Sequence, residues 1–280
     1  MKNTILKIFI GILIIVIVVL VYGAFIEPVR LTTKEIKVVS DTITDNFDGF
    51  KVVQISDIHY GTTVDKEMFE SIVNEINLLK PDIVLLTGDL FNSKVNLAEE
   101  SYQDITEVLK NINANIGKYA IKGDNDTNEK WEDIIKNSEF IDLNDRYELL
   151  YDNGNIPIIL SGISSNSSYG EINEKIAKID EYINTVEIKP CYSILILHEP
   201  DYVDNIDVSN YNLILAGHSL GGINIPIIGR VNLPNGATKY SHGKYSINNT
   251  DLYVSNGLGT DKRKFRLGSK PTINFYRIVK

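Results

Sequence analysis

Aspartate and histidine residues recur in short turns of this sequence, in combinations that suit a divalent metal ion. The turns are Ser56-Asp57-Ile58-His59, Gly88-Asp89, Gly123-Asp124-Asn125-Asp126, His198 and Gly217-His218. Carboxylate oxygens and imidazole nitrogens together are ligands typical of Mn, Fe and Zn sites. A lone Asp or His in a turn is more often a turn or capping residue, but three of the four histidines fall in this one pattern. We therefore expect the Asp and His side chains of these five turns to form a metal site.

Each of these turns follows a short apolar run that is typical of a β-strand. The predicted strands are residues 50–55, 82–87, 116–121, 193–197 and 212–216, with a further strand at 156–163. Helical spacing is found in 68–76, which stops at Lys80-Pro81, in 105–112, and in the polar segment 171–184. This order predicts an α/β sheet with helices on its faces. Because functional residues gather beyond the carboxyl ends of such strands, we expect all five turns at one edge of the sheet.

An apolar segment near the N-terminus is long enough to cross a membrane. Residues 8–26 carry no charge, and as a helix they would extend about 29 Å, close to the hydrocarbon thickness of a bilayer. We expect an uncleaved anchor, since a signal peptide has a shorter apolar region and a small-residue cleavage site. Lys2 and Lys7 precede the segment, which favours a single-pass protein of the cytoplasmic membrane with its C-terminal domain outside the cytoplasm.

Composition limits the partners of the remaining chain. Its 43% apolar and 23% charged residues are typical of a folded globular domain. The net charge of -9 disfavours nucleic acid, which requires clustered Lys and Arg. The single cysteine, Cys191, permits neither an intrachain disulfide nor a cysteine-based zinc cluster. We expect no nucleic-acid partner and predict no protein partner.

Taken in order, the five motifs resemble the metal-binding signature of the calcineurin-like phosphoesterase superfamily. Residues 252–259 are similar to its membrane-associated bacterial members. The resemblance implies a β-sandwich flanked by helices, one or two divalent ions (Mn, Zn or Fe), and hydrolysis of phosphomonoesters or phosphodiesters. Together with the apolar segment, it divides the chain into a cytoplasmic tip and transmembrane anchor (1–27), a membrane-proximal link with a first strand (28–49), and a metallophosphoesterase-like domain (50–280).

The resemblance also assigns metal-binding roles. Asp57 and His59 correspond to ligands of the first metal, Asp89 to the bridging ligand, and Asp124, His198 and His218 to ligands of the second metal. In such a site, paired cations hold the phosphate oxygens and activate a water that attacks phosphorus in line.

Three positions depart from the family pattern. Asp124 replaces an Asn ligand and adds a negative charge. Asn125 replaces the His that protonates the leaving group, and its amide cannot donate a proton; Asp126 orients that His in the family, so its role here is open. Leu220 replaces a metal-ligand His. We therefore expect one tightly bound metal, a second bound weakly or not at all, and slow turnover, because lost acid catalysis alone costs about 10²- to 10⁴-fold.

Two alternative functions stay open. A catalytically inactive, metal-bound phosphoesterase-like fold would serve as a binding or sensing module. Residues 217–221 also match the Gly-x-Ser-x-Gly motif of serine esterases, with Ser219 as nucleophile. The following residues are β-branched and broken by Pro226, which disfavours the helix this motif needs, and the only later histidine is His242. For the phosphoesterase, the expected substrate is a phosphorylated small molecule, lipid or cell-envelope component.

Overall fold

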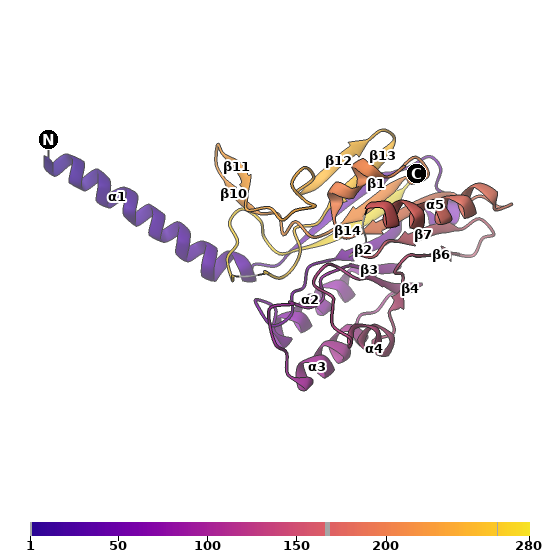
Figure 1. Cartoon of the computed structure of the whole chain (residues 1–280), viewed down its shortest axis with the longest axis horizontal. Coiled ribbons are helices and arrows are strands. Elements are labelled where there is room, and N and C mark those ends of the chain that lie inside the picture. The colour runs from indigo at the N-terminus through magenta and orange to yellow at the C-terminus, as the bar shows by residue number, and fades with distance from the viewer. Residues whose placement is uncertain (1, 166–168, 262) are drawn as a thin grey trace.

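Two six-stranded sheets pack face to face, and helices cover their outer faces (Figure 1). The computed structural model describes residues 2–165, 169–261 and 263–280. Its β-sandwich flanked by helices, preceded by one apolar N-terminal helix, confirms the expected fold class.

The N-terminal segment forms a helix that projects away from the two sheets (Figure 1). Helix α1 (Lys2–Val21) continues through a π-helical turn (Tyr22–Ile26) and a 3-10 turn (Glu27–Val29) into β1 (Thr32–Val39). None of the described residues of α1 is buried. The stretch Lys2–Val29 is long and apolar enough to cross a membrane.

The first sheet has the strand order β1-β14-β2-β3-β4-β5. Strand β14 pairs parallel with β1 and antiparallel with β2, and the pairs from β2 to β5 are parallel. Its other strands are β2 (Phe50–Ile55), β3 (Ile83–Thr87), β4 (Gly117–Ile121), β5 (Ile141–Asp142) and β14 (Thr272–Val279). Helices α2 (Lys66–Leu79), α3 (Glu99–Lys110) and α4 (Trp131–Asn137) pack on its outer face. Helix α2 begins where the Asp65 carboxylate accepts a hydrogen bond from the Met68 backbone N–H, an N-cap, and ends at Lys80 in a left-handed conformation.

The second sheet has the strand order β12-β13-β9-β8-β7-β6, with β7, β8, β9 and β13 parallel. Its strands are β6 (Arg146–Leu150), β7 (Ile158–Gly162), β8 (Tyr192–Leu197), β9 (Leu213–Ala216), β12 (Gly243–Ile247) and β13 (Thr250–Val254). Helix α5 (Tyr169–Thr185) and a 3-10 segment (Pro200–Asn205) contribute to the core on its outer face. A separate hairpin, β10 (Ile223–Ile225) and β11 (Gly229–Val231), follows β9.

Continuous apolar runs in the central strands reflect burial on both faces. In β2, Phe50 and Val52 face the core between the sheets, while Val53 and Ile55 face the helices. The same alternation holds in β8, where Ile194 and Ile196 face the inter-sheet core.

One sequence-based expectation about the fold was wrong. The five strands that precede the polar turns do not lie in one sheet: β2, β3 and β4 belong to the first sheet, and β8 and β9 to the second. Apolar periodicity identifies buried strands but not their partners. The turns still meet, because the two sheets place these carboxyl ends together: Gln54 in β2 donates a hydrogen bond to the Ala216 carbonyl at the end of β9.

Candidate metal centre

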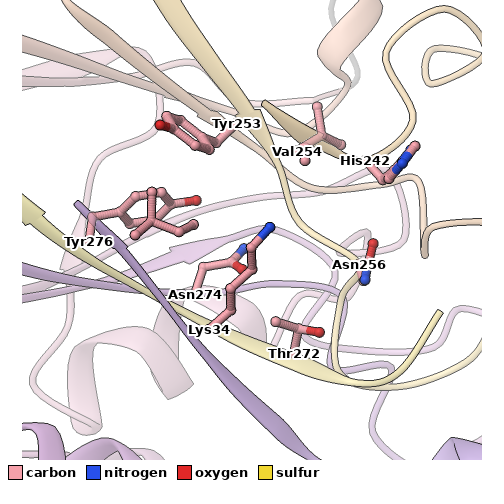
Figure 2. A pocket seen from close by; sticks show the side chains of 10 residues that line it. Lys34, His242, Tyr253, Val254, Asn256, Thr272, Asn274 and Tyr276 are labelled. Carbon is pink, nitrogen blue, oxygen red and sulfur yellow. The ribbon is translucent and has the colours of Figure 1, made fainter. Parts of the chain in front are cut away.

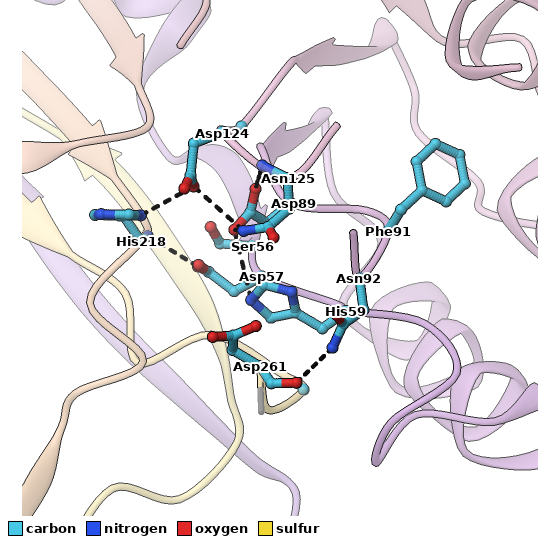
Figure 3. Close-up of polar contacts among 12 residues, drawn as sticks. Ser56, Asp57, His59, Asp89, Phe91, Asn92, Asp124, Asn125, His218 and Asp261 are labelled. Carbon is cyan, nitrogen blue, oxygen red and sulfur yellow. Dashed lines mark hydrogen bonds and ion pairs between the residues drawn. The ribbon is translucent and has the colours of Figure 1, made fainter. Parts of the chain in front are cut away.

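Six side chains from both sheets converge at this end of the sandwich. Figure 3 shows Asp57, His59, Asp89, Asp124 and His218 among them. They form two groups that share one residue: Asp57, His59 and Asp89, and Asp89, Asp124, His198 and His218. Within each group the potential ligand atoms lie within 4.8 Å of one another. All six predicted ligands are therefore brought together, and Asp89 belongs to both groups.

The backbone is in an uncommon conformation at four of the six residues. Asp57, His59, Asp89 and His218 have φ angles of 51°, 46°, 57° and 68°. Non-glycine residues adopt this left-handed region infrequently, and such strain clusters at functional sites.

Two glycines allow the loops to approach closely. A Cβ at Gly88, whose φ is +94°, would collide with the His198 imidazole and lie 2.8 Å from the Gly123 backbone N. A Cβ at Gly123 would collide with the Asp89 carboxylate. Any larger residue at either position would push the metal-binding groups apart.

Backbone carbonyls orient the two imidazoles of the larger group. His198 Nδ1 lies 2.7 Å from the Thr87 carbonyl, and His218 Nε2 lies 2.7 Å from the Asn235 carbonyl. A carbonyl only accepts hydrogen bonds, so these nitrogens carry protons, and the opposite nitrogen of each ring presents a lone pair when the ring is neutral. His198 Nε2 lies 3.3 Å from both Asp89 Oδ2 and Asp124 Oδ1, and His218 Nδ1 lies 3.3 Å from Asp124 Oδ1. A backbone carbonyl that accepts from the ring nitrogen facing away from the cluster is a typical partner of a metal-binding histidine.

Two buried polar atoms in the cluster fit a missing cation. Asp57 Oδ1 and His59 Nδ1 have no hydrogen-bond partner among the described residues. Leaving such atoms buried and unpaired is costly. A divalent cation would satisfy carboxylate and imidazole donors together, and this oxygen and nitrogen set suits Mn, Zn or Fe. The residues present therefore fit a metal, whose identity they do not fix.

The charges of the cluster depend strongly on one another. Burial, the largest influence, opposes ionisation of Asp89, but the adjacent His198 and His59 lower its pKa below the ordinary value. Burial likewise opposes protonation of His198, yet Asp89 and Asp124 raise its pKa well above 6.5. In the protein without metal, a proton on His198 thus compensates the adjacent carboxylates.

Asn125, one of the departures from the family pattern, and its neighbour Asp126 both contact the loop of Asp89. The Asn125 amide donates a 2.8 Å hydrogen bond to Asp89 Oδ2, and its backbone N–H donates to Asp89 Oδ1. The Asp126 carboxylate accepts from the backbone N–H groups of Gly123, Asp89 and Phe91. Burial and the nearby Asp89 raise the pKa of Asp126 to about 7. Asp126 therefore ties the two loops together, and Asn125 holds the shared carboxylate.

Leu220 lies beside the smaller group. A Cβ placed on Gly257 would be 2.7 Å from Asp57 Cβ and 3.0 Å from Leu220 Cδ2, so these two side chains border the same point. An apolar side chain thus lies next to Asp57, and the part of the chain that the structure describes offers three His or Asp ligands to the smaller group.

The surroundings of Ser219 argue against a serine esterase. Ser219 is fully buried, donates to the Ser255 carbonyl and accepts from the Gly221 N–H. The chain continues into strand β10 rather than a helix. His242 instead lines a small cavity with Lys34 and Asn256 (Figure 2).

Sequence reasoning missed the residues that hold the loops. Arg266 is buried and donates to the carbonyls of Leu220, Asn256, Gly259 and Ser269. Burial lowers its pKa to about 10, although Asp57 and Glu27 oppose this. A lone Arg in a polar segment gives no signal of such a role, and neither do the carbonyls of Thr87 and Asn235.

Comparisons with known proteins agree with this geometry. The family model described as calcineurin-like phosphoesterase matches residues 50–222. The chain is 28% identical to the Bacillus subtilis (strain 168) protein described as an uncharacterized metallophosphoesterase, YkuE, covering 92% of this chain and 88% of that protein. It is 25% identical to a Danio rerio transmembrane protein with metallophosphoesterase domain, covering 93% of this chain but 60% of that protein.

Among solved structures, a purple acid phosphatase from yellow lupin (Lupinus luteus) is similar at a TM-score of 0.45 and 13% identity, covering 81% of this chain and 47% of that one. The family model covers well over half of the chain and includes all six residues of the cluster. The chain therefore belongs to the calcineurin-like phosphoesterase family.

Proposed function

We propose that this protein is a metal-dependent phosphoester hydrolase that acts slowly, outside the cytoplasmic membrane, on phosphomonoesters or phosphodiesters. The observation that carries the proposal is the pair of ligand groups joined by Asp89. One shared carboxylate holding two adjacent cations is the arrangement that two-metal phosphoryl chemistry needs.

The two ligand groups would each hold one cation. Asp57, His59 and Asp89 would hold one cation, and Asp89, Asp124, His198 and His218 the other. Bound cations would supply charge stabilisation to the phosphate and lower the pKa of an attacking water. Asp124 is the most open member, with 42% of its side chain exposed, so substrate would enter on its side.

The leaving group receives no proton from position 125. The Asn125 amide is already bound to Asp89, and an amide cannot act as an acid. Three Asp carboxylates also bring the site with two divalent cations and one hydroxide close to neutrality, which weakens its attraction for an anionic phosphate. Slow turnover follows from both features.

The proposed location rests on the N-terminal helix. Lys2 and Lys7 precede the apolar stretch, which favours the domain lying outside the cytoplasm. A short series of hydrogen bonds also connects the end of the helix to the metal cluster. Arg266 donates from its backbone N–H to the Gly23 carbonyl and from its side chain to the Gly259 carbonyl. The Gly259 N–H in turn donates to the Asp57 carbonyl. This short path supports a lipid-linked or cell-envelope phosphoester as substrate.

The test is an assay of the full chain in detergent micelles with nitrophenyl phosphate and bis-nitrophenyl phosphate, in Mn, Zn or Fe(II). We expect slow hydrolysis that Asp89→Ala abolishes. Asp104→Ala serves as the matched control, because Asp104 is a surface carboxylate paired with Lys66. Absence of hydrolysis with every metal would refute the proposed enzymatic activity. It would favour the inactive binding module, which is the alternative that Asn125 and Leu220 support.

A further inference from the structure

The hairpin β10–β11 ends in an exposed apolar tip. Ile227 is 106% exposed and Ile228 is 72% exposed. Ile227 has a φ of 74°, a conformation that is an outlier for a β-branched residue. Exposing two adjacent isoleucines to water at a strained turn is unfavourable. Such an apolar tip indicates a surface that binds an apolar partner.

The base of the hairpin is fixed to the segment 267–269. The Asn224 N–H donates to the Leu267 carbonyl at 2.7 Å. The Arg230 guanidinium donates to Ser269 Oγ at 2.6 Å and to the Gly221 carbonyl, and Ser269 Oγ donates to that same carbonyl at 2.9 Å. The direction of the hairpin is therefore set by this segment.

The end of the N-terminal helix is held by residues 265–269, which include this segment. The Arg266 N–H donates to the Gly23 carbonyl at 2.9 Å, and the Ser269 N–H donates to the buried Glu27 carboxylate at 2.6 Å. A Cβ at Gly23 would lie 2.6 Å from the Phe265 ring, so the contact is close. Helix and hairpin thus share one support, and both leave the domain at the same end (Figure 1).

Exposed cations flank this junction in the sequence. Arg263 and Lys264 precede the supporting segment, and Arg30 follows the helix; all three are exposed. In a chain with a net charge of -9, their position at the end of the apolar helix complements the anionic headgroups of a bilayer.

We propose that the tip of the hairpin, residues 225–229, inserts into the same bilayer that α1 spans. The occupant of this apolar surface is the lipid bilayer itself. The inference rests on the membrane placement in the proposed function. Since β10 begins five residues after His218, a second point of attachment would hold the metal cluster at a fixed height above the headgroups.

Tryptophan reporters test this in the full chain. Ile227→Trp, and separately Ile228→Trp, are reconstituted into liposomes of phosphatidylcholine and phosphatidylglycerol, with or without brominated acyl chains that quench on contact. Phe25→Trp, at a position 72% exposed at the end of the helix, reports the anchor. Ile188→Trp, at a position 53% exposed before the amino end of β8, is the matched control away from the metal cluster. The native Trp131 is fully buried and gives a constant background.

We expect brominated lipid to remove most of the added emission of Trp at 227, 228 and 25, and none of that at 188. If the reporter at 25 is quenched while those at 227 and 228 behave like the one at 188, the hairpin inference is refuted and the anchor stands. If the reporter at 25 also keeps its emission, the membrane placement fails, and the inference fails with it. Hydrolysis in micelles is measured separately and is independent of either result.

Discussion

Replacing Leu220 by His should add a fourth protein ligand to the smaller metal-binding group. Leu220 Cδ2 borders the same point as Asp57 Cβ, so a side chain at this position reaches that group. The φ of Leu220 is 49°, a region in which His is enriched and Leu is not. The substitution therefore adds an imidazole without adding backbone strain.

The expected gain follows from the ligand count. Among the described residues, the smaller group offers three potential His or Asp ligands and the larger offers four. Even loss of a residue that only supports a metal ligand costs about 10- to 100-fold in metal affinity, so gain of an imidazole ligand should tighten the weaker site by at least about tenfold, or about 1.4 kcal/mol. Calorimetric titration of the chelator-treated full chain with Mn or Zn measures both sites.

Leu220→Phe is the matched control, because it places a ring at the same position without a nitrogen. The weaker site should tighten in the His variant and stay unchanged in the Phe variant. Equal affinity in the native chain and the His variant would refute the argument that Leu220 limits the smaller group. A gain shared by the Phe variant would show that ring packing, rather than ligation, is responsible.

Three further predictions follow from the cluster. Asn125→His should raise phosphodiester hydrolysis by about 10²-fold or more by restoring a proton donor; an unchanged rate in the same assay would mean that leaving-group protonation does not limit turnover. Gly88→Ala should lower the free energy of unfolding by about 2 kcal/mol or more, because its Cβ would collide with the His198 imidazole at a φ of +94°; urea unfolding with native stability would contradict this. The raised pKa of His198 stabilises the metal-free chain fully below pH 6.5, and this contribution is lost as the pH rises through the higher folded-state pKa. Metal binding must displace that proton, so metal affinity should increase with pH; thermal unfolding with and without Zn across this range checks both trends, and a metal affinity that is flat with pH would count against the assignment.

The sequence predicted the positions of most elements around the cluster because these elements depend on local signals. Residues 50–55 form β2 within the expected limits, and α2 ends at the expected Lys80-Pro81 break. The six candidate ligands were found because Asp and His at strand ends are chemically distinctive. Their convergence in the structure agrees with that prediction, while their roles as ligands stay predictions.

The remaining features depend on contacts between distant segments. Apolar periodicity could not show that β4 and β8 belong to different sheets, since strands buried on both faces have the same composition in either. The carbonyl of Asn235, which orients His218, has no residue-type signal. Arg266 and Glu27 were overlooked because their burial is created only when the end of the helix meets the C-terminal loops.

The central claim is that Asp89 is shared by two cations of unequal affinity. Anomalous diffraction from crystals of the full chain grown with Mn or Zn tests it most directly. The expected result is a strong peak among Asp89, Asp124, His198 and His218, and a weaker one among Asp57, His59 and Asp89. Two equally occupied peaks would contradict the inequality, and no peak between Asp89 and His198 would contradict the metal centre itself.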